Sequence, residues 1–436
     1  MLRRPLLVLS LALLALTRTG LSADRRSLVS SGDAFIIQAP DARSWTIGTS
    51  DVRLTIALTR RGLQVTDLSS PHVGWWNIGS DPDTQISLGA GPMTLGSRWL
   101  VFEAAEASEY QGGVRLDLAF RSASPAARVT RTYVSYPRTP VVETWTTFEP
   151  LGSASLVVAD LNAFESAVYP GIIRWVPGHN VPASEGGPFT LMSRSLEPGS
   201  EMSLGSTGRA TERALPWFVI DAHGGRSFGG LVWSGAWEAR FSRTDSAIRV
   251  RLGLPPFATM ADSALETPHG FFGVTGESAD VSAAVQSFTM HAIRRGRAFE
   301  PLVAYNTWFA HGTRIDQETV LEEIDLAATL GIELFVLDAG WYGSNPDDPF
   351  DFTPGLGLWD FDPERFPHGL RALRDYAHDR GLRFGIWVEP ERVALATVDR
   401  PYLAKQRWLP SRAHLRAQDP QLGTYRPRPT KNGSEV

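Results

Sequence analysis

Hydrophobic and polar positions alternate in short runs over the first two thirds of the chain. Examples are Leu54–Leu58, Arg128–Val134 and Val141–Trp145, which are rich in β-branched and aromatic residues, the composition that favours strands. Clusters of Gly, Pro, Asp and Ser separate the runs, as at 184–188 and 224–226. No convincing amphipathic helix interrupts them, so the sequence predicts a large antiparallel β-sandwich over residues 32–290.

Near Pro301 the pattern changes to helices that alternate with short apolar strands. A first run, 303–305, ends at Asn306. Asp316 is placed to cap a helix that ends at Gly331 and is followed by a strand over 332–337. A second helix is predicted from Pro363 to Gly381, followed by a strand over 384–387. This order predicts a parallel sheet, and we expect residues 300–409 to form the first three β/α units of an incomplete TIM barrel.

The two ends of the chain differ from the rest. Arg3 and Arg4 precede an apolar stretch over 5–16 that is too short to span a bilayer, and small residues follow near position 22. Residues 1–23 are therefore predicted to be a signal peptide, in preference to a signal anchor, and the protein is expected to be secreted or periplasmic. Residues 410–436 show no strand or helix period, which predicts an irregular tail.

The amino-acid composition excludes several classes of chemistry and partner. The chain has no cysteine, which excludes disulfides, thiolate catalysis and Cys-ligated metals. The net charge of −5 gives no reason to expect a nucleic acid or an acidic membrane as partner.

Candidate functional residues lie where the predicted parallel strands end, which is where β/α barrels carry their active sites. Asp338 follows a buried strand, so its carboxylate would emerge at the barrel mouth; the alternatives are a helix N-cap and a surface partner for an arginine. Trp341 can offer its ring to the C–H face of a sugar, although a lone tryptophan there would otherwise be a core residue. Asn306 and Trp308 are expected on one side of the first strand.

The third strand end and one long loop add further candidates. Trp387, Glu389 and Glu391 alternate along an extended segment, so their side chains should share one side; Glu391 could instead pair with an arginine on the rim. The loop 344–362 contributes Trp359 and Asp360, and long loops at this face often carry function.

Taken in order, these segments resemble the melibiase-type α-galactosidases of glycoside hydrolase family 36. The family's Asn-Thr-Trp corresponds to 306–308 and its Asp-Asp-Gly-Trp to 338–341, where this chain has Asp-Ala-Gly-Trp. Leu358-Trp359-Asp360 loosely matches a Gly-Asp-Trp-like segment, and Phe-Gly-x-Trp-x-Glu-Pro-Glu matches 384–391. The resemblance covers roughly residues 125–409.

The resemblance implies an N-terminal β-supersandwich, a (β/α)8 catalytic barrel and a small C-terminal β domain. It also implies retaining hydrolysis of terminal α-galactosides by double displacement between two carboxylates about 5–5.5 Å apart. In the family the nucleophile lies in a Lys-Trp-Asp motif and the acid/base residue follows the sixth strand. Neither is present here, so we assign no catalytic residue, expect an inactive N-terminal fragment and leave open whether this chain is itself an enzyme.

The expected partner is a galactoside or other oligosaccharide, with no cofactor, no metal, no nucleic acid and no membrane after signal cleavage; oligomerisation is left open. The expected substrate-binding residues are Asn306, Trp308, Asp338, Trp341, Trp359, Asp360, Trp387, Glu389 and Glu391. Ala339 replaces one of the family's paired Asp residues, which bind ring hydroxyls including O6, so a pentose such as β-L-arabinopyranose is an alternative substrate. Two further alternatives are a carbohydrate-binding remnant that uses the sandwich alone, and a lyase or isomerase with Mg²⁺ on Asp338, Glu389 and Glu391.

Overall fold

A computed structural model describes most of the chain between residues 26 and 394. The described residues are 26–75, 81–89, 91–153, 155–159, 161–207, 209–222, 224–255, 259–277, 279–298, 300–343, 345–357, 359–389, 393–394 and 424–425. The predicted signal peptide at 1–23 lies outside these residues, as does the predicted tail at 410–436 except for 424–425.

The first layer is an antiparallel sheet of seven strands at the start of the chain. Its strands follow in sequence order, and the last of them pairs with the fifth. Their bounds are β1 Arg26–Ser31, β2 Ala34–Gln38, β3 Ser44–Gly48, β4 Arg53–Thr59, β5 Gly62–Ser70, β6 Gly74–Trp75 and β7 Asp81–Pro82. In β4 every second residue is buried, as expected for a strand with one face on a core.

A ten-stranded antiparallel sheet forms the second layer, in the order β10-β11-β12-β13-β25-β20-β19-β16-β17, with β24 paired to β13. These strands are β10 Val101–Tyr110, β11 Gly113–Ala123, β12 Ala126–Ser135, β13 Val141–Pro150, β16 Ile172–Pro177, β17 Met192–Ser195, β19 Ala214–Ala222, β20 Gly225–Val232, β24 Leu265–Glu266 and β25 His269–Gly276.

Two four-stranded sheets complete the β part, in the orders β23-β14-β8-β9 and β15-β22-β21-β18. Their strands are β8 Gln85–Leu88, β9 Gly91–Thr94, β14 Leu156–Ala159, β15 Asn162–Val168, β18 Glu201–Ser206, β21 Trp237–Arg243, β22 Ile248–Gly253 and β23 Thr259–Ala261. A 3-10 turn, η1, spans Ala183–Glu185. One continuous core joins all four sheets, with Trp45, Phe120 and Trp237 fully enclosed. The predicted antiparallel sandwich is confirmed.

One helix appears inside the range predicted as all-β. α1, Val281–Ala292, lies on the outer face of the ten-stranded sheet and buries Val281, Ala284 and Phe288 against residues such as Tyr136 and Phe271. The expectation of no helix before residue 290 is therefore wrong. The helix is short and contains Ser, Thr and Val, which are weak helix formers, so its stability comes mainly from packing on the sheet and the sequence carries little local signal.

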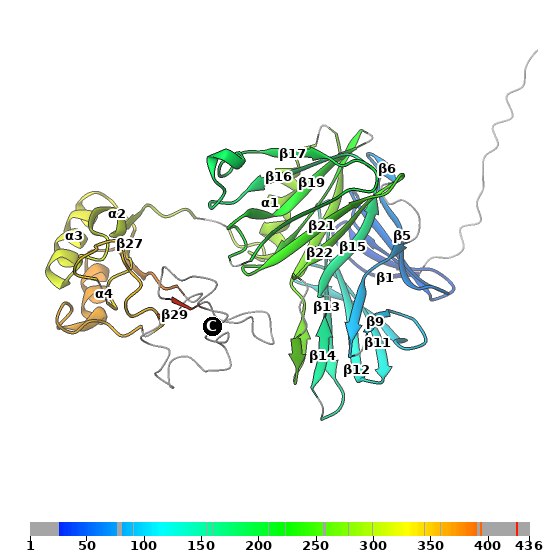
Figure 1. Cartoon of the computed structure of the whole chain (residues 1–436), viewed down its shortest axis with the longest axis horizontal. Coiled ribbons are helices and arrows are strands. Elements are labelled where there is room, and N and C mark those ends of the chain that lie inside the picture. The colour runs from blue at the N-terminus through cyan, green and yellow to red at the C-terminus, as the bar shows by residue number, and fades with distance from the viewer. Residues whose placement is uncertain are drawn as a thin grey trace, which may run out of the picture.

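After α1 the chain forms a separate β/α part (Figure 1). Its three-stranded parallel sheet has the order β26-β27-β28. The elements are β26 Ala304–Asn306, α2 Trp308–His311, α3 Gln317–Thr329, β27 Leu334–Leu337, α4 Gly369–Asp379 and β28 Arg383–Ile386. β29 Val393–Ala394 and β30 Thr424–Tyr425 pair with each other. The predicted alternation of strands and helices, the start of a barrel, is confirmed.

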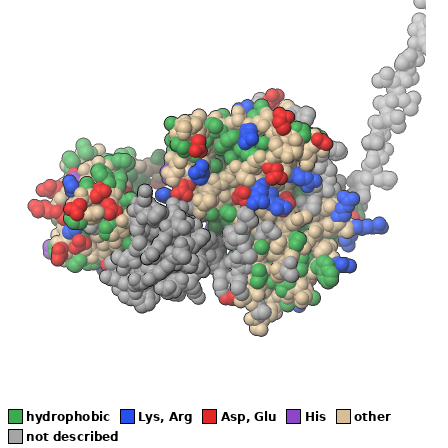
Figure 2. All heavy atoms as spheres, viewed as in Figure 1, with side chains coloured by type: hydrophobic (Ala, Val, Ile, Leu, Met, Phe, Trp, Pro, Cys, Tyr) green, Lys and Arg blue, Asp and Glu red, His purple; other side chains and the backbone are tan. Residues whose placement is uncertain are grey.

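The boundaries of this part have local causes. Asp316 caps α3 by accepting a hydrogen bond from the Thr319 amide at 2.9 Å, and Gly331 follows the helix with a φ of 75°, the conformation in which glycine ends helices. α4 begins at Gly369 and not at Pro363, because Pro367 disfavours a helical conformation in the residue before it. The outer face of α3 is acidic (Figure 2). Among the residues described, no helix is long and apolar enough to cross a bilayer.

Candidate functional site

The centre of the candidate site is a hydrogen-bonded pair at the ends of two neighbouring parallel strands. Asn306 Nδ2 donates to Asp338 Oδ2 at 2.6 Å, and the Ala339 amide donates to Asp338 Oδ1, also at 2.6 Å. Thr307 Oγ1 accepts a hydrogen bond from the Asp338 amide at 3.0 Å. Asp338 is only 8% exposed. Its carboxylate therefore has a fixed orientation, and these partners are neither a helix N-terminus nor a surface arginine.

Trp308 does not share a strand side with Asn306, contrary to the prediction. β26 ends at Asn306, and Trp308 is the first residue of α2. The cause is the Asn306 side chain, whose Oδ1 accepts from the Trp308 amide at 2.8 Å and turns the backbone, as Asn side chains commonly do. The Trp308 ring packs edge-on against Phe350 and Phe352, at centroid distances of 5.8 and 5.6 Å.

Beside this pair, four aromatic rings form one cluster from three segments. Trp341 and Trp359 stack at 6.1 Å, and Trp359 meets Trp387 edge-on at 6.4 Å. Tyr342, which the sequence reasoning did not select, lies between them, 5.0 Å from Trp359 and 6.2 Å from Trp387. Its position directly after Trp341 was the available signal. The structure thus brings together the tryptophans predicted from the second strand, the long loop and the third strand.

Trp341 itself is nearly enclosed. It is 3% exposed, and its Nε1 donates to the Trp387 carbonyl at 3.0 Å. It acts as a support for the half-buried Trp359 and Trp387 rings, which remain accessible to a ligand.

The loop that carries Trp359 holds a strained backbone. Trp359 has a φ of 56°, a left-handed conformation that costs a bulky residue about 1–3 kcal/mol and that clusters at functional sites. The surrounding rings fix the indole in this position. Asp360, the next predicted site residue, is solvent-exposed.

Glu389 is a second buried carboxylate in this part of the chain. After β28, Trp387 is half-buried, Val388 is 50% exposed and Glu389 is 6% exposed. The alternation agrees with the prediction that Trp387 and Glu389 point to one side. Glu391 lies outside the described residues. Across the part of the chain that is described, no three potential metal ligands come together.

Arg365 holds the turn that carries Asp338 and Trp341. Its Nη1 donates to the Gly340 carbonyl at 2.7 Å, and its Nη2 donates to the carbonyls of Thr313, at 2.5 Å, and Ile315. Burial lowers the pKa of Arg365, and the nearby Asp362 and Asp316 partly offset this effect. The three acceptors lie in two segments that are far from Arg365 in the sequence, so no local pattern marked this arginine.

Gly340 is needed at this turn for two reasons. Its φ of 109° is unfavourable for other residues, and a Cβ on it would lie 2.7 Å from the Thr313 Cα. Ala339 beside it is 1% exposed and belongs to the core of the β/α part.

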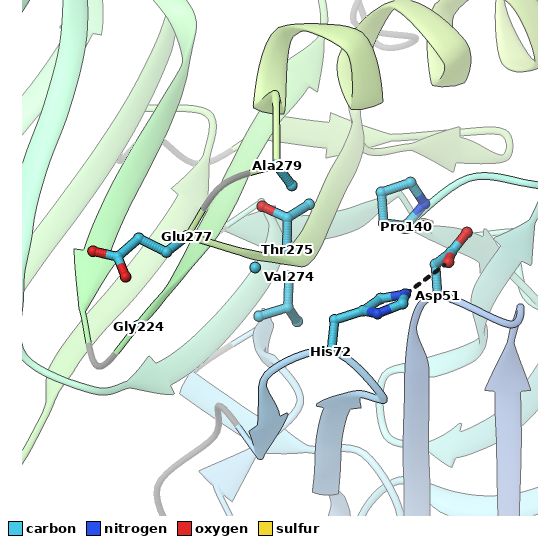
Figure 3. Close-up of a pocket in the computed structure, with 9 residues that line it drawn as sticks. Asp51, His72, Pro140, Gly224, Val274, Thr275, Glu277 and Ala279 are labelled. Carbon is cyan, nitrogen blue, oxygen red and sulfur yellow. Dashed lines mark hydrogen bonds and ion pairs between the residues drawn. The ribbon is translucent and has the colours of Figure 1, made fainter.

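A cavity of about 870 Å³ in the sandwich differs from this site in character (Figure 3). Its titratable residues are Asp51, His72 and Glu277, and His72 Nε2 lies 3.3 Å from Asp51 Oδ1. The Glu277 carboxylate points away from this pair (Figure 3). No aromatic ring other than the imidazole lines the cavity among the residues described, so it lacks a stacking surface for a sugar.

Comparison with known proteins shows a likeness to one family. Residues 265–408 match the Melibiase family model. α-Galactosidase AgaA of Geobacillus stearothermophilus is 28% identical over 299 residues, which is 64% of this chain and 39% of that protein. α-Galactosidase Mel36A of Lactobacillus acidophilus is 35% identical over 116 residues, 26% of this chain and 15% of that protein.

Solved structures agree on the fold. The α-galactosidase of Lactobacillus brevis superimposes with a TM-score of 0.68 at 18% identity, covering 89% of this chain and 60% of the other. AgaA in complex with 1-deoxygalactonojirimycin gives 0.67 at 20% identity, covering 88% and 61%. The resemblance to melibiase-type α-galactosidases of glycoside hydrolase family 36 is therefore confirmed, as is the fold, a β-sandwich followed by part of a TIM barrel. The chain spans less than two thirds of the length of these relatives.

Proposed function

We propose that this chain provides the sugar-binding part of a glycosidase that hydrolyses terminal α-galactosides with retention of configuration. The observation that carries the proposal is the Asn306–Asp338 pair, fixed at two parallel strand ends beside a cluster of indole rings. Support comes from relatives described as α-galactosidases and from AgaA structures in complex with raffinose and with stachyose.

The geometry explains how Asp338 can recognise a sugar. A carboxylate has about four acceptor positions, and one on each oxygen is already used by Asn306 Nδ2 and the Ala339 amide. The remaining positions can accept hydrogen bonds from two adjacent hydroxyls of a pyranose. Trp359 and Trp387 supply ring surface for the apolar C–H face of the same sugar.

In the proposed reaction, double displacement, the residues that bind the sugar differ from the residues that react with it. That reaction needs a nucleophile and an acid/base carboxylate about 5–5.5 Å apart, and none of the residues assigned here takes either part. Asp338 and its neighbours bind and orient the terminal sugar. Binding is therefore the property to measure on this chain.

The test is calorimetric titration of the full chain with 1-deoxygalactonojirimycin. Asp338→Ala should weaken binding by about 10- to 150-fold, because a hydrogen bond to a charged group contributes about 1.5–3 kcal/mol. The matched control is Asp325→Asn, which changes an exposed carboxylate on α3 that pairs with Arg380 and should leave the affinity unchanged. Equal affinities of wild type and Asp338→Ala would remove Asp338 from the proposed site.

The second candidate is recognition of a β-L-arabinopyranosyl unit, and Ala339 is the observation that favours it. The small, enclosed Ala339 side chain offers no acceptor for the O–H of a hydroxymethyl group. Competition experiments with D-galactose and L-arabinose distinguish the two sugars, since they differ in the group at C5. Tighter binding of galactose would refute the pentose candidate.

We also propose that the protein is exported, on the basis of the charged start and short apolar stretch within residues 1–23. N-terminal sequencing of protein recovered from the periplasm or medium should show a mature chain that begins near residue 24. Recovery in the cytoplasm with an intact Met1 would contradict export.

A further inference from the structure

A second cavity, of about 390 Å³, lies on the outer face of the ten-stranded sheet, where β16, β19 and β20 meet the start of α1. It belongs to the sandwich and shares no residue with the Asp338 site. α1 packs on one part of this sheet face, and the cavity opens beside its first turn. Leu191 is 62% exposed at the rim.

Strand alternation places one indole and one carboxylate side by side in this cavity. Trp217, Val219 and Asp221 point to the outer face of β19, since alternate residues of a strand share a face. The Trp217 ring is half-buried and packs against the apolar cluster under α1. One face of the cavity is therefore a supported aromatic surface.

The strand register adds two arginines to the same face. Arg226 lies directly opposite Asp221, and Arg174 lies opposite Val219. Arg226 Nε donates to Asp221 Oδ1 at 3.0 Å and its Nη1 donates to the Ala279 carbonyl at 3.1 Å, while Arg174 donates to Asp221 Oδ2. The side chains of Arg174, Arg226 and Asp221 are 37%, 34% and 21% exposed, so these fixed groups remain reachable from solvent.

The positive and negative charges in the cavity are equal in number, which favours a neutral ligand over an anion. The cavity is lined by two arginines and by two carboxylates, Asp221 and Asp280. The helix N-terminus is already capped, because the Asp280 side chain accepts from the Ser282 amide at 2.8 Å. No uncompensated positive charge is left to attract an anion. Guanidinium N–H groups and a carboxylate do, however, offer both donors and acceptors to a neutral ligand with hydroxyl groups.

We propose that this cavity, lined by Trp217, Asp221, Arg174 and Arg226, is a binding site for a neutral saccharide, separate from the strand-end site of the β/α part. The apolar face of a pyranose lies on Trp217, and its hydroxyls bond to Asp221 and the two guanidinium groups. The volume falls at the lower end of the roughly 300–1,000 Å³ range of small-molecule sites and suits one or two sugar rings.

The test uses the full chain with Asp338→Ala as background, so that the strand-end site does not contribute. Raffinose is titrated as a neutral probe and galacturonate as an anionic one, with binding followed by saturation-transfer NMR. Trp217→Ala in this background should weaken raffinose binding roughly three- to tenfold, the loss expected for one ring contact. The control is Trp99→Ala, which removes a tryptophan that is 61% exposed and has the Arg98 guanidinium 4.7 Å from its ring centroid.

A second variant keeps the test independent of folding, because Trp217 also supports the cluster under α1. Arg174→Gln changes a partly exposed side chain that pairs with Asp221 and lies outside the cluster under α1, and should weaken raffinose binding about tenfold. The proposal is overturned if the background protein does not bind raffinose, or if it binds galacturonate more tightly than raffinose. It is also overturned if Trp217→Ala and Arg174→Gln bind raffinose with the affinity of the background protein, or if Trp99→Ala loses as much affinity as Trp217→Ala. Raffinose binding that survives Asp338→Ala but not Trp217→Ala supports the cavity even where the strand-end assignment fails.

Discussion

His269, the first residue of β25, is held between two carboxylates on the outer face of the sandwich. Its Nδ1 lies 2.7 Å from Glu143 Oε1 and its Nε2 lies 3.0 Å from Glu266 Oε1. The imidazole also stacks on Trp145, with a centroid distance of 3.9 Å and an interplanar angle of 5°. Both ring nitrogens face negative charge, so the protonated form is favoured.

Burial lowers the pKa of His269, but the hydrogen bonds and charges of Glu143 and Glu266 outweigh burial and raise the pKa to about 9. An unfolded histidine has a pKa of about 6.5. Since the folded pKa is the higher one, the stabilisation is fully present below pH ~6.5 and is lost as the pH rises through about 9. The difference between these pKa values corresponds to about 3 kcal/mol of folding free energy.

The prediction is tested with His269→Gln, which keeps a polar side chain but cannot be charged. Urea denaturation of wild type and variant, followed by the circular dichroism of the β-sheets, gives the free energy of unfolding at pH 6 and at pH 10. The difference between the two proteins should shrink by about 3 kcal/mol from the lower to the higher pH. Tyr136, which donates to Glu143, stays protonated over this range because burial and Glu143 raise its pKa.

Arg121→Gln serves as the control, because it removes an exposed ion pair with Glu103. Its effect should be under about 1 kcal/mol at both pH values. A His269→Gln difference that is the same at pH 6 and pH 10 would falsify the reasoning, since the pH-dependent part of the stability would then come from other groups.

Two further predictions concern buried contacts. Asp83→Ala should destabilise the sandwich by about 3–5 kcal/mol, because it leaves the fully enclosed Arg131 guanidinium without its carboxylate. A loss in urea denaturation as small as that of Arg121→Gln would contradict this. Gly340→Ala should lower stability by about 1–3 kcal/mol, since the new Cβ would lie 2.7 Å from the Thr313 Cα, and should weaken binding of 1-deoxygalactonojirimycin in calorimetry. Wild-type affinity in Gly340→Ala would show that the turn does not position the sugar site.

The parallel strands could be predicted because their signals are local. Gly331 and Gly381 end α3 and α4 in the left-handed conformation, with φ of 75° and 78°, and each is followed within a few residues by an apolar run. Parallel strands bring their carboxyl ends to one edge, so the proximity of Asn306 and Asp338 also followed from the sequence. α1 did not follow, since its stability depends on the sheet beneath it.

The errors at the site have a common physical cause, which is that side chains hydrogen-bonded to the backbone set the local geometry. Trp308 left the strand because the Asn306 side chain accepts a hydrogen bond from the Trp308 amide in place of a neighbouring strand. Arg365 could not be recognised because its three acceptor carbonyls lie 25 to 52 residues away from it. Hydrogen bonds between one side chain and distant carbonyls leave no periodic pattern in the sequence, so they are visible only in the folded structure.

The two proposed sugar sites share a design and differ in solvent exposure. Each places an indole beside a carboxylate whose oxygens are fixed by N–H donors, Asp338 at the strand ends and Asp221 on the sandwich. Asp338 is only 8% exposed, whereas the Asp221 side chain is 21% exposed and shares its charge with two arginines. A hydrogen bond that is shielded from water is stronger, and a buried polar group left without a partner costs more free energy than an exposed one. Discrimination between sugars that differ by one hydroxyl therefore belongs to the Asp338 site, while the Asp221 site is suited to holding sugars with less selectivity.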